Sequence, residues 1–295
     1  MAEDFERAQK RLANIRAVDP LLGALRTISL GSWKAGLKRK VAVTRYREHL
    51  MSLLPSLLPY LHPGKRGLGR KPLSVSHIVV LVVGSERGLC GRFNKVIAEH
   101  TEQYLVKQKT DGIQVDLWAL GSRVIRIFRH RQRTLVWSNV LSATSLPSYR
   151  LACDLAHRWL LSYQGGDLDA VDVLYNVYLS AGRYKPKVVR LIPPQIPPTG
   201  RPSLDEPWPP PIIETDPLSL IKRIVEQASA ISIYECLLNS AVAEHSARYQ
   251  LMEEAVTNTK RLIDELTMEV QMARRHLITR EMQELAVGAG LIGPQ

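Results

Sequence analysis

The chain has 295 residues, 45% hydrophobic and 23% charged, which is typical of a folded protein with one large or two modest domains. A formal net charge of +12 favours an acidic partner, such as nucleic acid, an anionic membrane surface or an acidic protein cavity. Three widely spaced cysteines indicate neither a disulfide framework nor a metal site, and they favour a reducing compartment. The longest apolar patch, residues 50–61, is too short to span a bilayer, and the acidic N-terminus is not expected to be a secretory signal.

A long helix is predicted at the start of the chain, over residues 1–60. Its buried side is expected to carry the apolar residues Leu12, Ile15, Leu22, Leu25, Ile28, Val41, Leu50, Leu53 and Leu57. Pro20 interrupts this pattern, so the helix is expected to kink, or to restart after Asp19. The lysines and arginines of this segment fit either a solvated helix face or a basic surface turned toward an acidic partner.

Residues 73–193 alternate between strand patterns and helix patterns. The continuous run IVVLVV at 78–83 is rich in β-branched residues, which is typical of a buried parallel strand. Further strands are expected at 114–120, 134–140, 170–179 and 188–192, and helices at 93–106, 123–131 and 149–163. The alternation predicts a Rossmann-like α/β domain with a doubly wound, mostly parallel sheet.

The end of the chain is predicted to form a second long helix, over residues 217–292. It follows a stiff connector at 194–216, because residues 193–217 contain ten of the eighteen prolines. Asp216 before Pro217 is a helix start signal, and Gly288 is a stop signal. A helix of this length would measure about 100 Å and would need a partner along it, so we expect an antiparallel coiled coil with the N-terminal helix. A bundle of shorter helices is the alternative.

The best candidate for chemistry is the segment GSERGLCGRFN, residues 84–94, which follows the first strand of the middle domain. Phosphate can bind at such a position, but the glycine spacing matches neither a P-loop nor a dinucleotide fingerprint, so a tight turn is favoured. Cys90 has no identifiable histidine partner, which favours a buried structural thiol over a nucleophile. The basic run 123–133 offers only Phe128 for base stacking, which favours a solvated helix face over nucleic-acid binding. Neither an active site nor a metal site is predicted.

Two motifs resemble the gamma subunit of F-type ATP synthases, the central rotor shaft of that complex. The first is GLCGRFN, which contains Gly88, Leu89, Cys90, Gly91, Phe93 and Asn94. The second falls at the family's spacings near the C-terminus, with Ala247, Arg248, Met252, Ala255, Asn258, Leu266, Arg274, Ile278, Thr279, Glu281, Glu284, Gly288 and Ala289. The segments 121–131 and 171–180 also resemble the family's middle domain, so the resemblance covers essentially the whole chain.

The resemblance implies that the terminal helices form a left-handed antiparallel coiled coil with the Rossmann-like domain at its foot. The coiled coil would stand inside a ring of three alpha and three beta subunits, and the foot would bind the epsilon subunit and the ring of c subunits. Proton flow would turn the shaft and drive the beta sites through their binding states. The shaft itself would be non-catalytic, would need no cofactor, and would lie peripherally at the cytoplasmic face of the bacterial inner membrane.

By the same resemblance, residues expected to contact or couple to the beta subunit are Arg248, Arg274, Arg275, Thr279 and Glu281. Residues 88–94 are expected to form a structural turn. The chain departs from the family pattern in its N-terminal helix, where Leu25 replaces a methionine, and at Arg275, which replaces a glutamine. A gamma-like paralogue in an alternative ATPase complex therefore stays open, as do a Rossmann-like nucleotide-binding protein and a nucleic-acid-binding coiled-coil protein.

Overall fold

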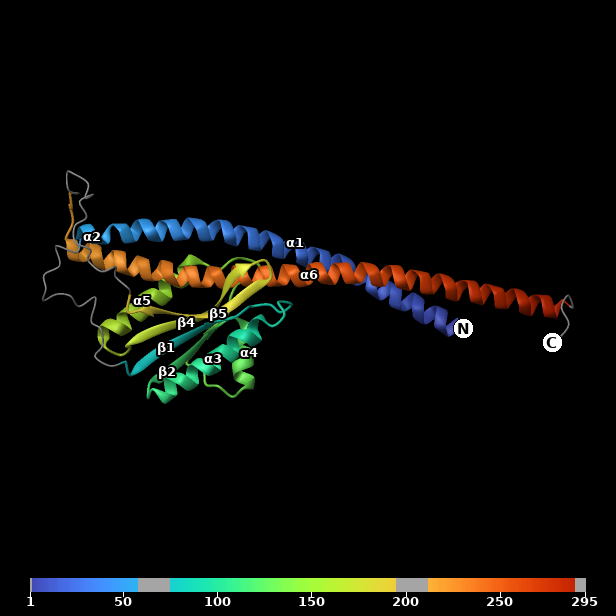
Figure 1. Cartoon of the computed structure of the whole chain (residues 1–295), viewed down its shortest axis with the longest axis horizontal. Helices are drawn as coiled ribbons and strands as arrows, with labels where there is room; N and C mark the ends of the chain where they lie inside the picture. Colours follow the sequence, from blue (N-terminus) through green and yellow to red (C-terminus); the bar gives the residue numbers. More distant parts are fainter. Residues whose placement is uncertain (1, 58–74, 195–211, 290–295) are drawn as a thin grey trace. The chain divides into compact units, whose positions relative to one another are not determined.

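The computed structural model describes residues 2–57, 75–194 and 212–289 (Figure 1). Most of the predicted proline-rich connector lies outside the described residues, and so do the last few positions of both predicted terminal helices. The chain divides into two units, one formed by residues 1–29 with 249–295 and the other by residues 30–248. Each unit is described by itself.

In chain order, the elements are α1 (Ala2–Ser52), α2 (Leu54–Leu57), β1 (His77–Val83), α3 (Phe93–Thr110), β2 (Gln114–Leu120), α4 (Ser122–His130), β3 (Trp137–Asn139), α5 (Tyr149–Gly165), β4 (Ala170–Ser180), β5 (Arg183–Ile192) and α6 (Pro217–Gly288). The five strands form one sheet in the order β3-β2-β1-β4-β5. All neighbouring pairs are parallel except β4 and β5, which are antiparallel. The predicted mostly parallel sheet is therefore confirmed.

The last strand is longer than the sequence pattern predicts. β5 begins at Arg183 rather than at residue 188. The chain turns back directly after β4 because Gly182 adopts a φ of +68°, which a residue without a Cβ adopts at little cost. β4 and β5 therefore form a hairpin at the edge of the sheet.

Helices cover both faces of the sheet, because side chains along a strand point alternately to opposite faces. On β1, Leu81 is in one buried cluster with Trp159 of α5 and Leu237 of α6. Its neighbour Val80 is in a second cluster, with Phe128 of α4 and residues of α3. Figure 1 shows α3 and α4 on the side of the sheet opposite α6. Burial on both faces explains why β1 is apolar from Ile78 to Val83.

In the unit formed by residues 30–248, α1 and α6 pack as an antiparallel pair. Thr44 Oγ1 donates a hydrogen bond of 2.8 Å to the Glu235 carboxylate, which also pairs with Arg47 at 2.9 Å. Earlier in α1, Gly36 lies against Val242 of α6, so closely that a Cβ at Gly36 would be 2.6 Å from Val242 Cγ2. In these contacts the residue number on α6 increases as the residue number on α1 decreases, so the two helices run antiparallel.

The other unit pairs the beginning of α1 with the end of α6. Arg16 donates to Thr267 at 3.4 Å, and Arg26 forms an ion pair with Glu253 at 3.3 Å. These contacts are again antiparallel, so the predicted pairing of the terminal helices is confirmed. Pro20 does not restart the helix as one sequence interpretation expected, because α1 continues through it. Among the described residues, no helix is long and apolar enough to cross a membrane.

Candidate functional site

The loop between β1 and α3 occupies the place where doubly wound folds bind their ligands. β1 pairs with β2 on one side and with β4 on the other, so the strand order reverses direction between β1 and β4. Ligands of such sheets bind in the crevice beyond the carboxyl ends of the strands at this point. Residues 84–92 begin there, and they include most of the GLCGRFN motif.

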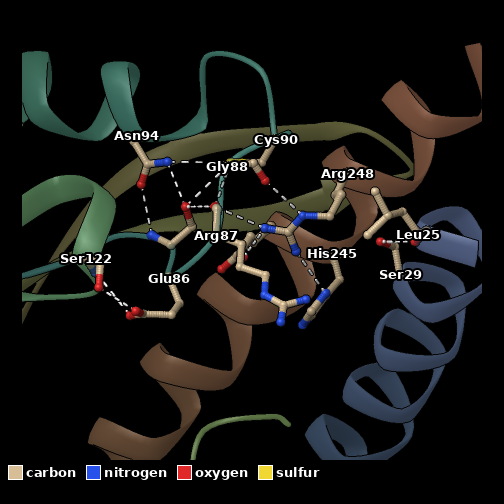
Figure 2. Close-up of polar contacts among 12 residues, drawn as sticks. Leu25, Ser29, Glu86, Arg87, Gly88, Cys90, Asn94, Ser122, His245 and Arg248 are labelled. Atoms are coloured by element: carbon tan, nitrogen blue, oxygen red, sulfur yellow. Dashed lines mark hydrogen bonds and ion pairs between the residues drawn. The ribbon is translucent and has the colours of Figure 1, made fainter. Parts of the chain in front are cut away.

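The loop satisfies its own polar groups. The backbone N–H of Ser85 donates to Asn94 Oδ1 at 2.8 Å, and Asn94 Nδ2 donates to Ser85 Oγ at 2.7 Å. Ser85 Oγ in turn donates to the carbonyl of Arg87 at 2.7 Å. Leu89 and Gly91 both have a φ of 60°, which folds the loop tightly enough for these bonds to close. Figure 2 shows the resulting network between the loop and the first turn of α3.

Arg248 of α6 joins this loop to the helix. Its Nε donates to the carbonyl of Gly88 at 3.1 Å, and its Nη2 donates to the carbonyl of Arg87 at 3.2 Å (Figure 2). The same Nη2 pairs with Glu244 at 2.5 Å, one helical turn earlier. The side chains of Arg248 and Glu244 are only 6% and 8% exposed, so each buried charge needs the other to compensate for its loss of hydration. Burial raises the pKa of Glu244, and the Arg248 guanidinium opposes that rise.

His245 completes the polar cluster on α6. Its Nδ1 lies 3.3 Å from Nη1 of Arg248. Since a guanidinium can only donate, Nδ1 must accept, which places the ring proton on Nε2. Burial, followed by the nearby Arg248 charge, lowers the pKa of His245 to about 4. His245 is therefore neutral at physiological pH.

Glu86 connects the loop to two other segments. Its carboxylate accepts hydrogen bonds from the Ser122 hydroxyl, from the Ser122 backbone N–H at 3.1 Å and from the Leu141 backbone N–H at 2.9 Å. Burial would raise the pKa of Glu86, but the bonds from Ser122 and Leu141 outweigh it, so the pKa is lowered. Glu86 therefore stays ionised and caps the N-terminus of α4.

The crevice at this edge of the sheet is nearly closed. The cavity lined by Gly84, Glu86, Ser142, Glu244 and neighbouring residues has a volume of about 20 Å³. That volume can hold about one water molecule, whereas ligand pockets measure about 300–1,000 Å³. Side chains of α6 fill the space in which a doubly wound fold holds a nucleotide.

The arrangement offers little chemistry. Cys90 is 2% exposed, and burial raises the pKa of its thiol, so it is a poor nucleophile. Within residues 2–57, 75–194 and 212–289, no group of histidine, cysteine and carboxylate side chains could hold a metal ion. The cluster instead fixes the loop to α6 through buried, charge-assisted hydrogen bonds.

The other residues predicted from the resemblance lie elsewhere. Arg274, Arg275, Thr279 and Glu281 are all exposed on α6, in the unit that contains residues 249–289. Thr279 Oγ1 donates to the Arg275 carbonyl at 2.9 Å, as is common for threonine within a helix. Arg248 belongs to the other unit, where it is buried.

Sequence reasoning missed Glu244, His245 and Glu86. Glu244 stands four residues before Arg248, and this i,i+4 spacing was a usable signal for an ion pair. Glu86 gave no comparable signal, because its partners are 36 and 55 positions away.

Comparison with known proteins defines the class. The family model described as ATP synthase matches residues 5–290, so the chain belongs to the ATP synthase family. Several of its relatives are named gamma chains. The "ATP synthase gamma chain" of Rubrobacter xylanophilus is 29% identical over 97% of this chain and 96% of its own length. That of an Anaeromyxobacter species is 32% identical over 71% of each chain.

Solved structures show the same fold. A chain of the Euglena gracilis mitochondrial ATP synthase, in a structure of OSCP, F1 and the c-ring, matches with a TM-score of 0.62 and 15% identity, over 100% of this chain and 98% of its own. A chain from the central stalk and c-ring of the Tetrahymena thermophila mitochondrial enzyme matches with a TM-score of 0.57 and 19% identity, over 80% of this chain and 99% of its own.

Proposed function

We propose that this chain is the central rotor stalk of a proton-translocating F-type ATP synthase, where it couples rotation of the c-ring to ATP synthesis and hydrolysis in the alpha/beta head. The observation that carries the proposal is the pairing of two long terminal helices in a chain that resembles gamma chains over almost its full length. The chain itself is non-catalytic. It acts by favouring different conformations of the head as it turns.

Its partners are the alpha and beta subunits, the epsilon subunit and the c-ring. The exposed residues Arg274, Thr279 and Glu281 would meet beta-subunit loops, since they match the family's coupling positions and their side chains face solvent in the isolated chain. Arg275, which stands where the family has a glutamine, is exposed beside them and would join these contacts. The chain would lie peripherally at the cytoplasmic face of the bacterial inner membrane and be held there by the complex. A gamma-like role in an alternative ATPase complex would use the same features.

The cluster around Arg248 has a mechanical role in this proposal. A rotor transmits torque between its parts, so those parts must be held rigidly against each other. Arg248 binds two loop carbonyls and Glu244 at once, so the β1–α3 loop cannot shift on α6 without exposing or orphaning buried charges. The cluster would therefore hold the sheet rigidly against the first half of α6.

A nucleotide-binding function is disfavoured because α6 side chains occupy the crevice where a nucleotide would bind. Purification from native membranes tests the proposal directly. The tagged chain, extracted with a mild detergent, should copurify with alpha, beta and epsilon subunits and with ATPase activity. Recovery of the chain with nucleic acid, or alone with bound nucleotide, would contradict it.

A further inference from the structure

The two sides of α4 differ sharply in character. The helix buries three apolar residues in the cluster beneath the sheet, which are Val124, Ile125 and Phe128. Its exposed residues are all basic, and they are Arg123, Arg126, Arg129 and His130. At 3.6 residues per turn, these four basic residues fall within an arc of about 120° on the side of the helix away from the sheet. We call the three arginines of this arc the arginine face.

The part of the chain that carries the arginine face contains no acid. Neither aspartate nor glutamate occurs between Asp116 and Asp154. The acid that comes closest from α3 is Glu102, which pairs with the two arginines that follow α4 instead. Arg131 lies 3.7 Å from this carboxylate and Arg133 lies 2.6 Å from it. The positive charge of the arginine face is therefore not neutralised from its own segment.

Two further acids of neighbouring elements are also engaged elsewhere. Glu99 of α3 lies 4.0 Å from Arg92 and 3.8 Å from Lys95. The Glu86 carboxylate accepts its hydrogen bonds from Ser122 and from the loop after β3. Among the residues that the structure describes, no guanidinium of the arginine face forms an ion pair. Three unpaired arginines on one exposed side of a helix form a surface for an anionic partner.

The character of this surface distinguishes between the possible anionic partners. Single-stranded nucleic acid stacks its bases on exposed aromatic side chains, but Phe128, the one aromatic residue of α4, is fully buried. A protein interface surrounds its arginines with aromatic or apolar side chains, and only the half-buried Ile127 borders the arginine face. An anionic membrane surface requires only positive charge that can approach the headgroups.

We propose that the arginine face docks the free chain on the anionic lipid headgroups of the membrane before the chain joins its complex. The choice of a membrane over duplex nucleic acid rests on the proposed function, which places the chain at a membrane. The guanidinium groups pair with lipid phosphates, while the apolar side of α4 stays packed on the sheet. Docking is therefore electrostatic, reversible and sensitive to salt. It concentrates newly made chains at the surface where the c-ring lies.

Cosedimentation of the full-length chain with lipid vesicles tests this proposal. The vesicles contain equal parts of phosphatidylglycerol and phosphatidylcholine. We expect the chain to bind them, to ignore vesicles of phosphatidylcholine alone, and to be released by strong salt. The variant Arg123→Gln/Arg126→Gln/Arg129→Gln should bind about a hundredfold more weakly, because each basic residue near an anionic surface contributes about fivefold.

Two control variants separate the arginine face from net charge and from specific recognition. Lys34→Gln/Lys38→Gln/Arg45→Gln removes the same charge from exposed positions of α1, and it should weaken binding by less than about tenfold. Replacing the three arginines of the face by lysine should leave binding close to wild type, because attraction to a charged membrane does not need the guanidinium fork. All variants should unfold at the wild-type temperature, since every substituted residue is exposed.

Three results would overturn the proposal. Equal losses in the two glutamine variants would show that net charge alone attracts the chain. An equal loss in the lysine variant would show bidentate recognition of a specific acidic partner. Loss of duplex DNA binding in the arginine-face glutamine variant, with vesicle binding unchanged, would assign the face to nucleic acid. None of these results affects copurification with ATP synthase subunits, so this proposal and the proposed function can fail separately.

Discussion

The close contact between Gly36 of α1 and Val242 of α6 can be tested by adding a single methyl group. In Gly36→Ala, the new Cβ would lie 2.6 Å from Val242 Cγ2, which is well inside normal contact distance, and 3.6 Å from Leu146 Cδ2, which is an ordinary contact. Overpacking of this kind costs about 1–3 kcal/mol, whereas replacing glycine by alanine within a helix gains about 1 kcal/mol. We therefore expect a net loss of about 1 kcal/mol. Gly31→Ala is the matched control, because a Cβ there meets nothing within 4 Å, and it should stabilise by about 0.5–1 kcal/mol.

Backbone hydrogen exchange followed by mass spectrometry would measure both effects locally, in peptides covering residues 30–52. Exchange should be faster in Gly36→Ala and slower in Gly31→Ala than in the wild type. The double variant Gly36→Ala/Val242→Ala should recover part of the loss, because truncating Val242 makes room for the new methyl group. If Gly36→Ala protected this segment as well as Gly31→Ala does, the inference that the two helices touch at Gly36 would be wrong.

Three further predictions concern polar residues. Arg248→Ala should destabilise the protein by about 3 kcal/mol in urea unfolding, because it leaves Glu244 buried without its partner. Stability should fall by about 2 kcal/mol from pH 7 to pH 5, because the unfolded state protonates His245 near pH 6.5 whereas the folded state resists protonation down to about pH 4. Arg274→Ala should fold normally but reduce ATP-driven proton pumping by the assembled complex, since Arg274 is exposed and matches a coupling position.

Each of these predictions has a control. Arg248→Lys should recover only part of the stability, because an ammonium cannot reproduce the guanidinium's fork of contacts. His245→Gln should flatten the stability profile between pH 5 and 7, and an unchanged slope would mean that other groups cause it. Arg280→Ala removes a charge from the same helix without touching a predicted coupling position. Wild-type pumping by Arg274→Ala would show that Arg274 has no coupling role.

The sequence predicted those helices and strands in which burial determines the type of residue at each position. β1 is buried on both faces and is apolar from Ile78 to Val83. Apolar spacing also marks the two long helices, but it was wrong in placing Ile28, Val41 and Leu53 on the buried side of the N-terminal segment, because all three are exposed. The residue types in the first half of β5 do not indicate a buried strand. It alternates exposed basic residues with half-buried ones and contains Pro186, a pattern that is also typical of a loop.

The candidate site was only partly predictable for a different reason. The motif residues Gly88 and Arg248 could be found from their resemblance to a family, but the bond between them joins positions 160 residues apart. Local sequence patterns do not show that two residues so far apart in the chain come into contact. The burial that lowers the pKa of His245 likewise comes from elements packed around α6, so it becomes visible only in the folded chain.

β5 also bears on how the chain behaves before it meets its partners. As the last strand of the sheet, it has one side that pairs with no other strand of the described chain. An unpaired edge can recruit a strand from another molecule and so begin aggregation. Arg183, Lys185 and Lys187 place like charges along this edge, and Pro186 removes one backbone donor. Newly made chains waiting for assembly are therefore protected against joining one another edge to edge.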